Sequence, residues 1–174
     1  MTTPLPDAAA SVTSRPVADA DAPAISALHG RVFGPGRFVR SAYRVREGTP
    51  FASRYCRVAL AGDQIVAALR MTPVRIGTAG GALLLGPLAV NPAFANLGHG
   101  RRLIAESLTL ARADGLSLVV LVGDMAYYGR LGFLPVQPLG KIRLPGPADP
   151  ARILALELRA SAVGEFAGLV APQA

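Results

Sequence analysis

The chain of 174 residues has few of the side chains that bind metals or form disulfides. It contains one cysteine, Cys56, two histidines, His29 and His99, and no tryptophan. A single cysteine excludes an internal disulfide, and so few soft ligands do not make a convincing zinc site. The sequence therefore predicts a protein that binds no metal.

Long hydrophobic runs and a leader pattern are also missing. The longest clean apolar run, "LSLVVLV", is far shorter than the roughly 18 to 20 residues that a membrane-spanning helix needs. The N-terminus has neither the early basic residues nor the apolar stretch of a signal peptide. We therefore expect a cytoplasmic protein with no membrane partner.

Lysine is almost absent, and arginine supplies the positive charge. Lys and Arg together number 18 against 11 acids, yet Lys141 is the only lysine. Seven arginines fall between Arg31 and Arg57, where Glu47 is the only acid. Such a segment is typical of a solvated helix face, or of a surface that meets an acidic substrate, RNA or DNA. A nucleic-acid partner is the least favoured, because the chain has no aromatic stacking array or known nucleic-acid motif.

Hydrophobic periodicity predicts alternating strands and helices in one domain, residues 12–174, after a flexible arm, residues 1–11. The predicted strands are residues 12–17, 53–62, 64–77, 82–90, 116–123, 133–137 and 152–160, and the predicted helices are about 19–33, 37–48, 97–114 and 125–132. The strand, helix and strand from Leu83 to Val122 indicate a parallel crossover. The fold class is therefore α/β, with a mixed sheet and helices on both faces.

A glycine turn stands between one strand and the next helix. The stretch "NLGHGRR", Asn96 to Arg102, exposes backbone amides at the positive end of a helix, where phosphates bind. The dinucleotide fingerprint needs a third glycine where Leu103 stands, and a P-loop needs lysine where Arg101 stands. Neither of these two phosphate sites fits.

A third kind of site is suggested by "GPLAVNPAFANLGHGRRLI" followed by "VVLVGDMAYYGRLGF". This pair of stretches resembles the GNAT superfamily of acyl-CoA-dependent N-acetyltransferases, in particular its YhbS-like branch. The resemblance implies a mixed, mostly antiparallel sheet of six or seven strands flanked by about four helices, with a splayed strand pair forming a cleft for coenzyme A. It also implies direct transfer of an acetyl group from acetyl-CoA to an amine of a small molecule or protein. Because family members dimerise in several ways, a homodimer is one expected state.

The resemblance assigns the glycine turn and the strand before it to coenzyme A. Ala95 stands where the family usually has Arg or Gln, so one side-chain contact is absent and Arg101 or Arg102 is expected to replace it. Proline cannot donate to a sheet ladder, and Gly86-Pro87 therefore predicts a bulge in the strand. The implied cofactor-binding residues are Leu88, Ala89, Val90, Asn96, Leu97, Gly98, His99, Gly100, Arg101 and Arg102.

Acyl transfer needs a donor for the oxyanion, a base for the amine and a proton for the departing thiolate. The resemblance implies that the backbone N–H of Leu88 or Ala89 is the oxyanion donor. It implies that Tyr128, in the ending Tyr-x-x-x-Gly-Phe, is the general acid. Asp124 is the candidate base, but it also stands where a carboxylate caps the next helix. An ordered water or Glu47 is the alternative.

Three further expectations concern the acceptor and the rival functions. Arg40 and Arg44 lie where family members build part of the acceptor site, so they are expected to bind an acidic group, and Tyr127 is expected to line the substrate site or the core. A coenzyme A-binding sensor without turnover stays open, because Ala95 is unusual and the strand before the turn has no glutamate. A basic nucleic-acid-associated protein is the second alternative.

Overall fold

The computed structural model describes residues 11–36 and 41–173. The predicted arm lies outside the described residues except for Ser11, and so does Arg40. The first strand covers Val12–Pro16, close to the strand predicted at residues 12–17.

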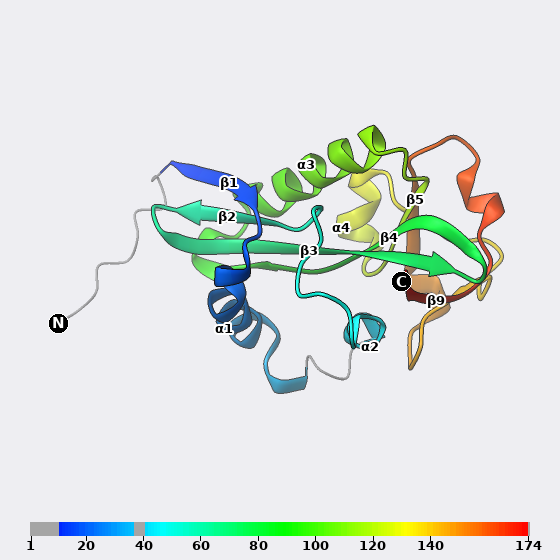
Figure 1. Cartoon of the computed structure of the whole chain (residues 1–174), viewed down its shortest axis with the longest axis horizontal. Helices are drawn as coiled ribbons and strands as arrows, with labels where there is room; N and C mark the ends of the chain where they lie inside the picture. The colour runs from blue at the N-terminus through cyan, green and yellow to red at the C-terminus, as the bar shows by residue number, and fades with distance from the viewer. Residues whose placement is uncertain (1–10, 37–40, 174) are drawn as a thin grey trace.

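The described residues form one mixed sheet of nine strands (Figure 1). These are β1 (Val12–Pro16), β2 (Arg57–Ala61), β3 (Gln64–Ile76), β4 (Ala79–Val90), β5 (Leu118–Val122), β6 (Leu134–Pro135), β7 (Ile142–Arg143), β8 (Ile153–Glu157) and β9 (Gly168–Pro172). The main order is β1-β2-β3-β4-β5-β8-β6, and β9 pairs with both β3 and β7. Only the pairs β4/β5 and β7/β9 are parallel. The predicted class, a mixed and mostly antiparallel sheet, is confirmed.

The strand count exceeds the expected six or seven because β7 and β9 were not predicted. β7 has only two residues, which is too short for an alternating pattern. β9 begins with glycine and ends with proline, the residue types that are depleted in strands.

Four α-helices flank the sheet in the described residues: α1 (Ala22–Phe33), α2 (Ser41–Arg46), α3 (His99–Ala113) and α4 (Met125–Tyr128). Figure 1 shows α3 on one side of the long strands and α1 and α2 on the other. The buried residues agree, since Leu103 and Ile104 of α3 pack with Leu83, whereas Ile25 and Leu28 of α1 pack with Ala89. The sheet is therefore the middle layer of three.

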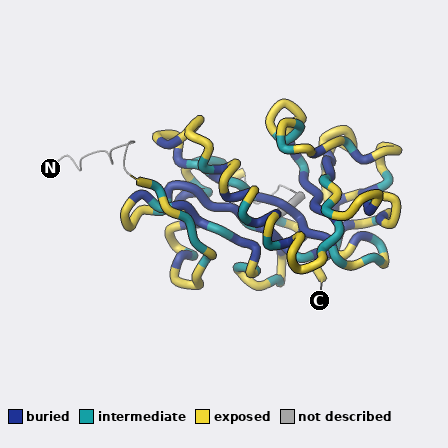
Figure 2. The backbone as a smooth tube through the Cα atoms, turned by 90° about the horizontal axis from the view of Figure 1, so that it is seen from above, coloured by how far each residue is buried: buried dark blue, intermediate teal, exposed yellow. Residues whose placement is uncertain are grey.

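The core follows the periodicity of the sequence. Leu103, Ile104, Leu108 and Ala111 repeat at helical spacing on α3, and all four are buried against the sheet. Figure 2 shows that the central strands are mostly buried while the exposed residues lie in the peripheral segments. The strand β5 is buried on both faces, as its continuous apolar run predicted.

Two features of the described residues bear on membranes and metals. No helix among them is long and apolar enough to cross a membrane. No group of three or more His, Cys, Asp or Glu side chains in that part of the chain is arranged to hold a metal ion.

Candidate active site

The strands β4 and β5 pair over only part of their length. Ala82, Leu83 and Leu84 lie opposite Leu118, Val119 and Val120 in parallel register. Beyond Leu84, β4 continues to Val90 along β3 without a strand of the described residues on its other side. The two parallel strands therefore splay apart and leave one edge of β4 unpaired.

A bulge lies at the point where the strands separate. Leu69 of β3 lies opposite Leu88, and Met71 lies opposite Leu85, so Gly86 and Pro87 together face one residue of β3. Gly86 has φ +125°, a conformation that favours glycine. The bulge predicted from Gly86-Pro87 is confirmed.

The backbone of β4 alternates between its two neighbours. The N–H of Asn91 donates to the carbonyl of Val66 on β3, and hydrogen-bonded positions in an antiparallel ladder recur at every second residue. Ala89 therefore directs its N–H and C=O towards β3, whereas Leu88 and Val90 direct theirs into the gap. Of the two amides considered as oxyanion donor, only that of Leu88 faces the gap.

The start of α3 lies at the end of this gap. Gly98 is the N-cap residue with φ +85°, and Asn96 has φ +61°, so the turn relies on left-handed backbone. No side chain of the described residues caps the helix, which leaves its first amides available. A Cβ at Gly100 would come within 3.1 Å of Leu88 Cδ2, so glycine lets α3 approach β4 closely.

A cleft of about 1010 Å³ follows the splayed ends of β4 and β5. It is lined by the bulge, by the splayed ends of β4 and β5, by α4 and by residues from the α2 side. These include Leu85, Gly86, Pro87, Leu88, Val90, Val122, Asp124, Tyr127, Tyr128, Tyr43 and Arg46. Several residues predicted from distant parts of the sequence thus share one cavity.

Both tyrosines of α4 line this cleft, but they differ in burial. Tyr128 packs edge-on against Phe133, with ring centroids 5.9 Å apart, and burial raises its pKa to about 12. Tyr127 is 45% exposed, and burial raises its pKa while the charge of Arg101 opposes the rise. Tyr128 is therefore a phenol held in its protonated form at neutral pH on the wall of the cleft.

Asp124 stands at the N-cap of α4, as predicted, but its side chain does not cap the helix. Its backbone carbonyl accepts hydrogen bonds from Tyr127 and Tyr128, while its carboxylate forms an ion pair with Arg152 at 3.0 Å. The side chain is 73% exposed and lines the cleft. The expectation of a side-chain cap was wrong because Arg152, 28 residues away, takes the carboxylate instead.

The basic residues after the glycine turn have different surroundings. Arg102 is held by Glu106 at 3.1 Å and by the carbonyl of Val12 at 2.8 Å. Arg101 is exposed and close enough to Tyr127 to influence its pKa. His99 is half-buried beside Phe94, and its Nε2 atom has no partner among the described residues. Of the two arginines, Arg101 is thus the one that lies near Tyr127 on the cleft wall. Ala95 and Leu97 are exposed in the turn.

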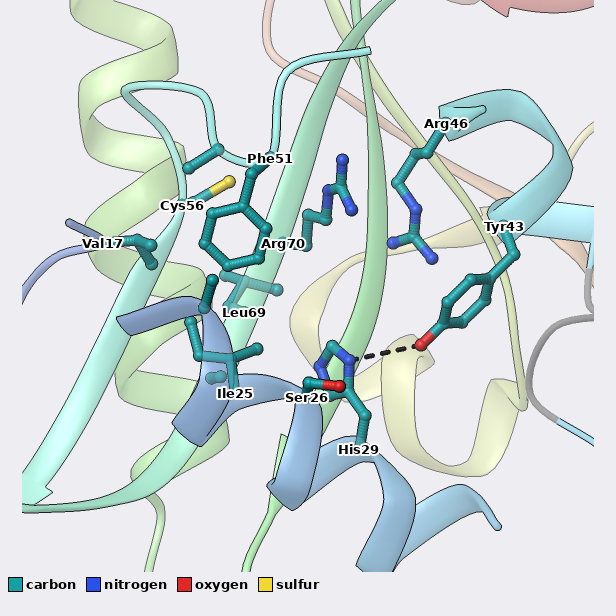
Figure 3. A pocket seen from close by; sticks show the side chains of 13 residues that line it. Val17, Ile25, Ser26, His29, Tyr43, Arg46, Phe51, Cys56, Leu69 and Arg70 are labelled. Carbon is teal, nitrogen blue, oxygen red and sulfur yellow. Dashed lines mark hydrogen bonds between the residues drawn. The ribbon is translucent and has the colours of Figure 1, made fainter. Parts of the chain in front are cut away.

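A second, smaller cavity of about 290 Å³ lies between α1, α2 and β3. Tyr43 and Arg46 line both cavities, so the two adjoin. Figure 3 shows Arg46 and Arg70 directed to this pocket, with the Tyr43 hydroxyl 3.2 Å from His29 Nδ1.

Of the two predicted acceptor arginines, the one that the structure describes, Arg44, lines neither cavity. Arg44 is exposed and lies against Gly146, and Arg40 lies outside the described residues. Arg46 and Arg70 were missed because they are 24 residues apart in the sequence. The positive segment containing Arg46 was the only available signal.

The sheet splits between two parallel strands, and a helix N-terminus lies at the end of the split. This arrangement is the one expected of the acyl-CoA-dependent acyltransferases that the sequence resembles. A family model described as the acetyltransferase (GNAT) domain matches residues 13–136. The chain therefore belongs to the GNAT acetyltransferase family.

Two solved structures of GNAT family acetyltransferases are similar to this chain. The GNAT family N-acetyltransferase YhbS from Escherichia coli, solved in complex with CoA, is 27% identical with a TM-score of 0.79, covering 99% of this chain and 93% of its own. A GNAT family acetyltransferase from Brucella melitensis, in complex with acetyl-CoA, is 26% identical with a TM-score of 0.70, covering 94% and 97%.

A more distant structure shares the fold alone. The ribosomal-protein-S18-alanine N-acetyltransferase from Escherichia coli is 18% identical with a TM-score of 0.63, covering 87% of this chain and 96% of its own. A search of curated protein sequences finds no match.

Proposed function

We propose that the chain transfers an acetyl group from acetyl-CoA directly to an amine, with the reaction centre in the cleft between β4 and β5. The observation that carries this proposal is the unpaired edge of β4, which leads from the bulge at Gly86 to the open amides at the start of α3. Two of the similar structures are complexes with CoA or acetyl-CoA, which supports the choice of cosubstrate.

The residues present fit coenzyme A. The amides from Leu97 to Arg101 would hold the pyrophosphate at the positive end of α3, with Arg101 adding a side-chain charge. The N–H and C=O groups of Leu88 and Val90 that face the gap would pair with the amides of the pantetheine arm. Gly100 keeps this path open at the junction of α3 and β4. Bound acetyl-CoA supplies the thioester from which the acetyl group is transferred.

The proposed chemistry assigns one role to each group on the cleft wall. The amine nitrogen forms a bond to the thioester carbon, and the N–H of Leu88 stabilises the charge that develops on the carbonyl oxygen. Asp124, the carboxylate beside α4, accepts the proton that the amine loses. As the carbon–sulfur bond breaks, Tyr128 donates its hydroxyl proton to the sulfur. These steps yield an amide and free coenzyme A.

The proposal is tested by calorimetric titration with acetyl-CoA, coenzyme A and NAD, followed by a thiol-release assay over a panel of amines. The proposed enzyme binds both coenzyme A species and not NAD, and it releases thiol only when an amine is present. Binding without release for any amine would favour the sensor, and no binding to either coenzyme A species would refute both. A cytoplasmic location and a homodimer stay predictions, to be checked by fractionation and by sedimentation.

A further inference from the structure

Arg46 is the most deeply buried charge of the described residues and is only partly satisfied. It is 4% exposed, and its Nη1 atom donates to the carbonyl oxygen of Gly86 at the bulge. Its Nε and Nη2 atoms have no hydrogen-bond partner among the described residues. The guanidinium stacks over the ring of Tyr43, with 4.4 Å between Cζ and the ring centroid. Stacking covers one face of the group but leaves two N–H donors unsatisfied.

A second guanidinium lies beside the first. Arg70, on β3 opposite the bulge, is half-buried and donates to the carbonyl of Pro50 at 3.0 Å. Burial, together with the charge of Arg70, lowers the pKa of Arg46 to about 10. The pKa of Arg70 is also lowered by burial. Two positive groups, one buried and one half-buried, thus line the same cavity.

No acidic side chain of the described residues compensates this pair. None of their aspartates or glutamates forms an ion pair with Arg46 or Arg70. The described residues that line the smaller cavity include no Asp or Glu. Burying a charge without a partner is unfavourable, so such an arrangement is normally completed by an anion. No acidic side chain of the described residues supplies that anion in this cavity, which leaves the place to a ligand.

The position of Arg46 shows where the ligand would lie. Arg46 lines both cavities and contacts Gly86, two residues before the Leu88 amide that faces the cleft. An anion bound there is therefore close to the reaction centre, and only a few bonds can separate it from the attacking amine. The remainder of the smaller cavity is mainly apolar, with Ile25, Phe51 and Leu69 among its walls (Figure 3).

We propose that Arg46 and Arg70 bind the carboxylate of the amine acceptor, and that this acceptor is a small apolar amino acid whose side chain fills the cavity beside α1. This inference rests on the proposed acetyl transfer and names the acceptor class for the same site. It assigns the acidic group expected on the acceptor to Arg46 and Arg70, in place of Arg40 and Arg44.

The test compares matched acceptors at saturating acetyl-CoA. Leucine, valine and phenylalanine are each compared with the corresponding primary amide, decarboxylated amine and phosphonate analogue. The wild-type protein prefers the amino acids, with kcat/KM at least about tenfold above that of the amides, because the amides leave a guanidinium unpaired. Equal use of acid and amide would overturn the proposal, and preference for the phosphonates would overturn the choice of a carboxylate.

Substitutions of single arginines show which side chains cause the preference for amino acids over their amides. Arg70→Gln and Arg46→Gln raise KM for the amino acids about 10- to 100-fold, change kcat less, and remove the preference over the amides. Arg46→Lys retains a charge and part of the preference. Arg75→Gln removes an exposed arginine of the same strand and leaves the preference intact. Unchanged preference in Arg70→Gln and Arg46→Gln would refute the assignment.

A binding measurement separates this inference from the proposed function. The N-acetyl derivatives of the same amino acids raise the melting temperature of the wild-type protein but not that of Arg70→Gln. Acetylation of neutral amines alone would refute the acceptor class and leave the acetyltransferase standing. If no amine is acetylated, the proposed function fails, and the melting-temperature difference still decides whether the two arginines bind a carboxylate.

Discussion

Gly100, in the first turn of α3, lies against the hydroxyl of Tyr127 on α4. A Cβ at position 100 would come within 3.1 Å of Tyr127 Oη and of Leu88 Cδ2. Three elements, α3, α4 and β4, thus meet at the end of the cleft where the helix amides are open. The side chains of Leu88 and Tyr127 approach the backbone of α3 closely because residue 100 has no Cβ.

Replacement of that glycine tests the contact. Gly100→Ala should lower the free energy of unfolding by about 1–3 kcal/mol through overpacking and weaken acetyl-CoA binding, because α3 is pushed away from β4. Urea unfolding and calorimetry measure the two effects. Gly164→Ala is the control, since its added Cβ meets no atom within 4 Å. Unchanged acetyl-CoA affinity in Gly100→Ala would argue against a binding path along this junction.

Tyr128→Phe removes the proposed proton donor while keeping the ring that packs on Phe133. We expect kcat to fall about 100-fold or more, the range of general acid catalysis, with little change in KM for acetyl-CoA. The matched variant Tyr127→Phe, on the more exposed neighbour, should retain most of the activity. Full activity of Tyr128→Phe in the thiol-release assay would assign the acid elsewhere.

The pH profile reports on the same tyrosine. Because burial raises its pKa to about 12, the phenol stays protonated at and above neutral pH, and the supply of this proton sets no limit on the rate below about pH 11. A fall in kcat between pH 9 and 10, absent from Tyr128→Phe, would contradict this assignment.

The proposed role of Asp124 as the base is tested by comparing its substitution with that of its ion-pair partner, Arg152. Asp124→Asn removes the proposed base and should lower kcat/KM about 100-fold at neutral pH. Arg152→Gln breaks the ion pair but retains the carboxylate, so its activity should stay within a few-fold of the wild type. Equal losses in both variants would mean that Asp124 acts only by holding this part of the cleft in place.

The charge cluster around Glu106 predicts a pH-dependent stability. Burial alone would raise the pKa of Glu106, but hydrogen bonds from Ser14 and two arginines outweigh it and hold the pKa below its usual value. The folded-state pKa therefore lies below the unfolded one, and the stabilisation is present above about pH 4.3 and lost at lower pH.

Glu106→Gln should accordingly lower the free energy of unfolding by about 1–2 kcal/mol at pH 7, with a smaller difference near pH 3. Urea unfolding at both pH values measures it. Glu165→Gln is the control, because its ion pair with Arg159 is more than half exposed on both sides and should contribute little. A loss that is the same at both pH values would show that packing, rather than charge, is responsible.

Local patterns predicted most of the fold. The apolar residues Ile104, Leu108 and Ala111 identified α3, because burial of one helix face gives a helical period. Leu97, which the sequence placed on the same stripe, lies exposed in the turn before the helix. The unbroken apolar run of β5 identified a strand buried on both faces. Proline at position 87 predicted the bulge because it cannot donate to a ladder. The strands β7 and β9 were missed because their pairing depends on long-range contacts rather than on any local period.

The site was less predictable where it depends on distant pairs. The glycine turn and the tyrosines were found from a contiguous motif, but the ion pair of Asp124 with Arg152 joins residues 28 positions apart. Arg46 and Arg70 share a cavity only because α2 packs across the bulge of β4. No spacing rule in the sequence relates them, so the acceptor side of the site emerged only from the fold.

The most direct test of the central claim is a single transfer assay, in which the protein is incubated with acetyl-CoA and an amine panel and the products are identified by mass spectrometry. The account predicts one N-acetyl product for each coenzyme A released, and strong suppression of both in Tyr128→Phe. Coenzyme A binding with no acetylated amine from any member of the panel would contradict it.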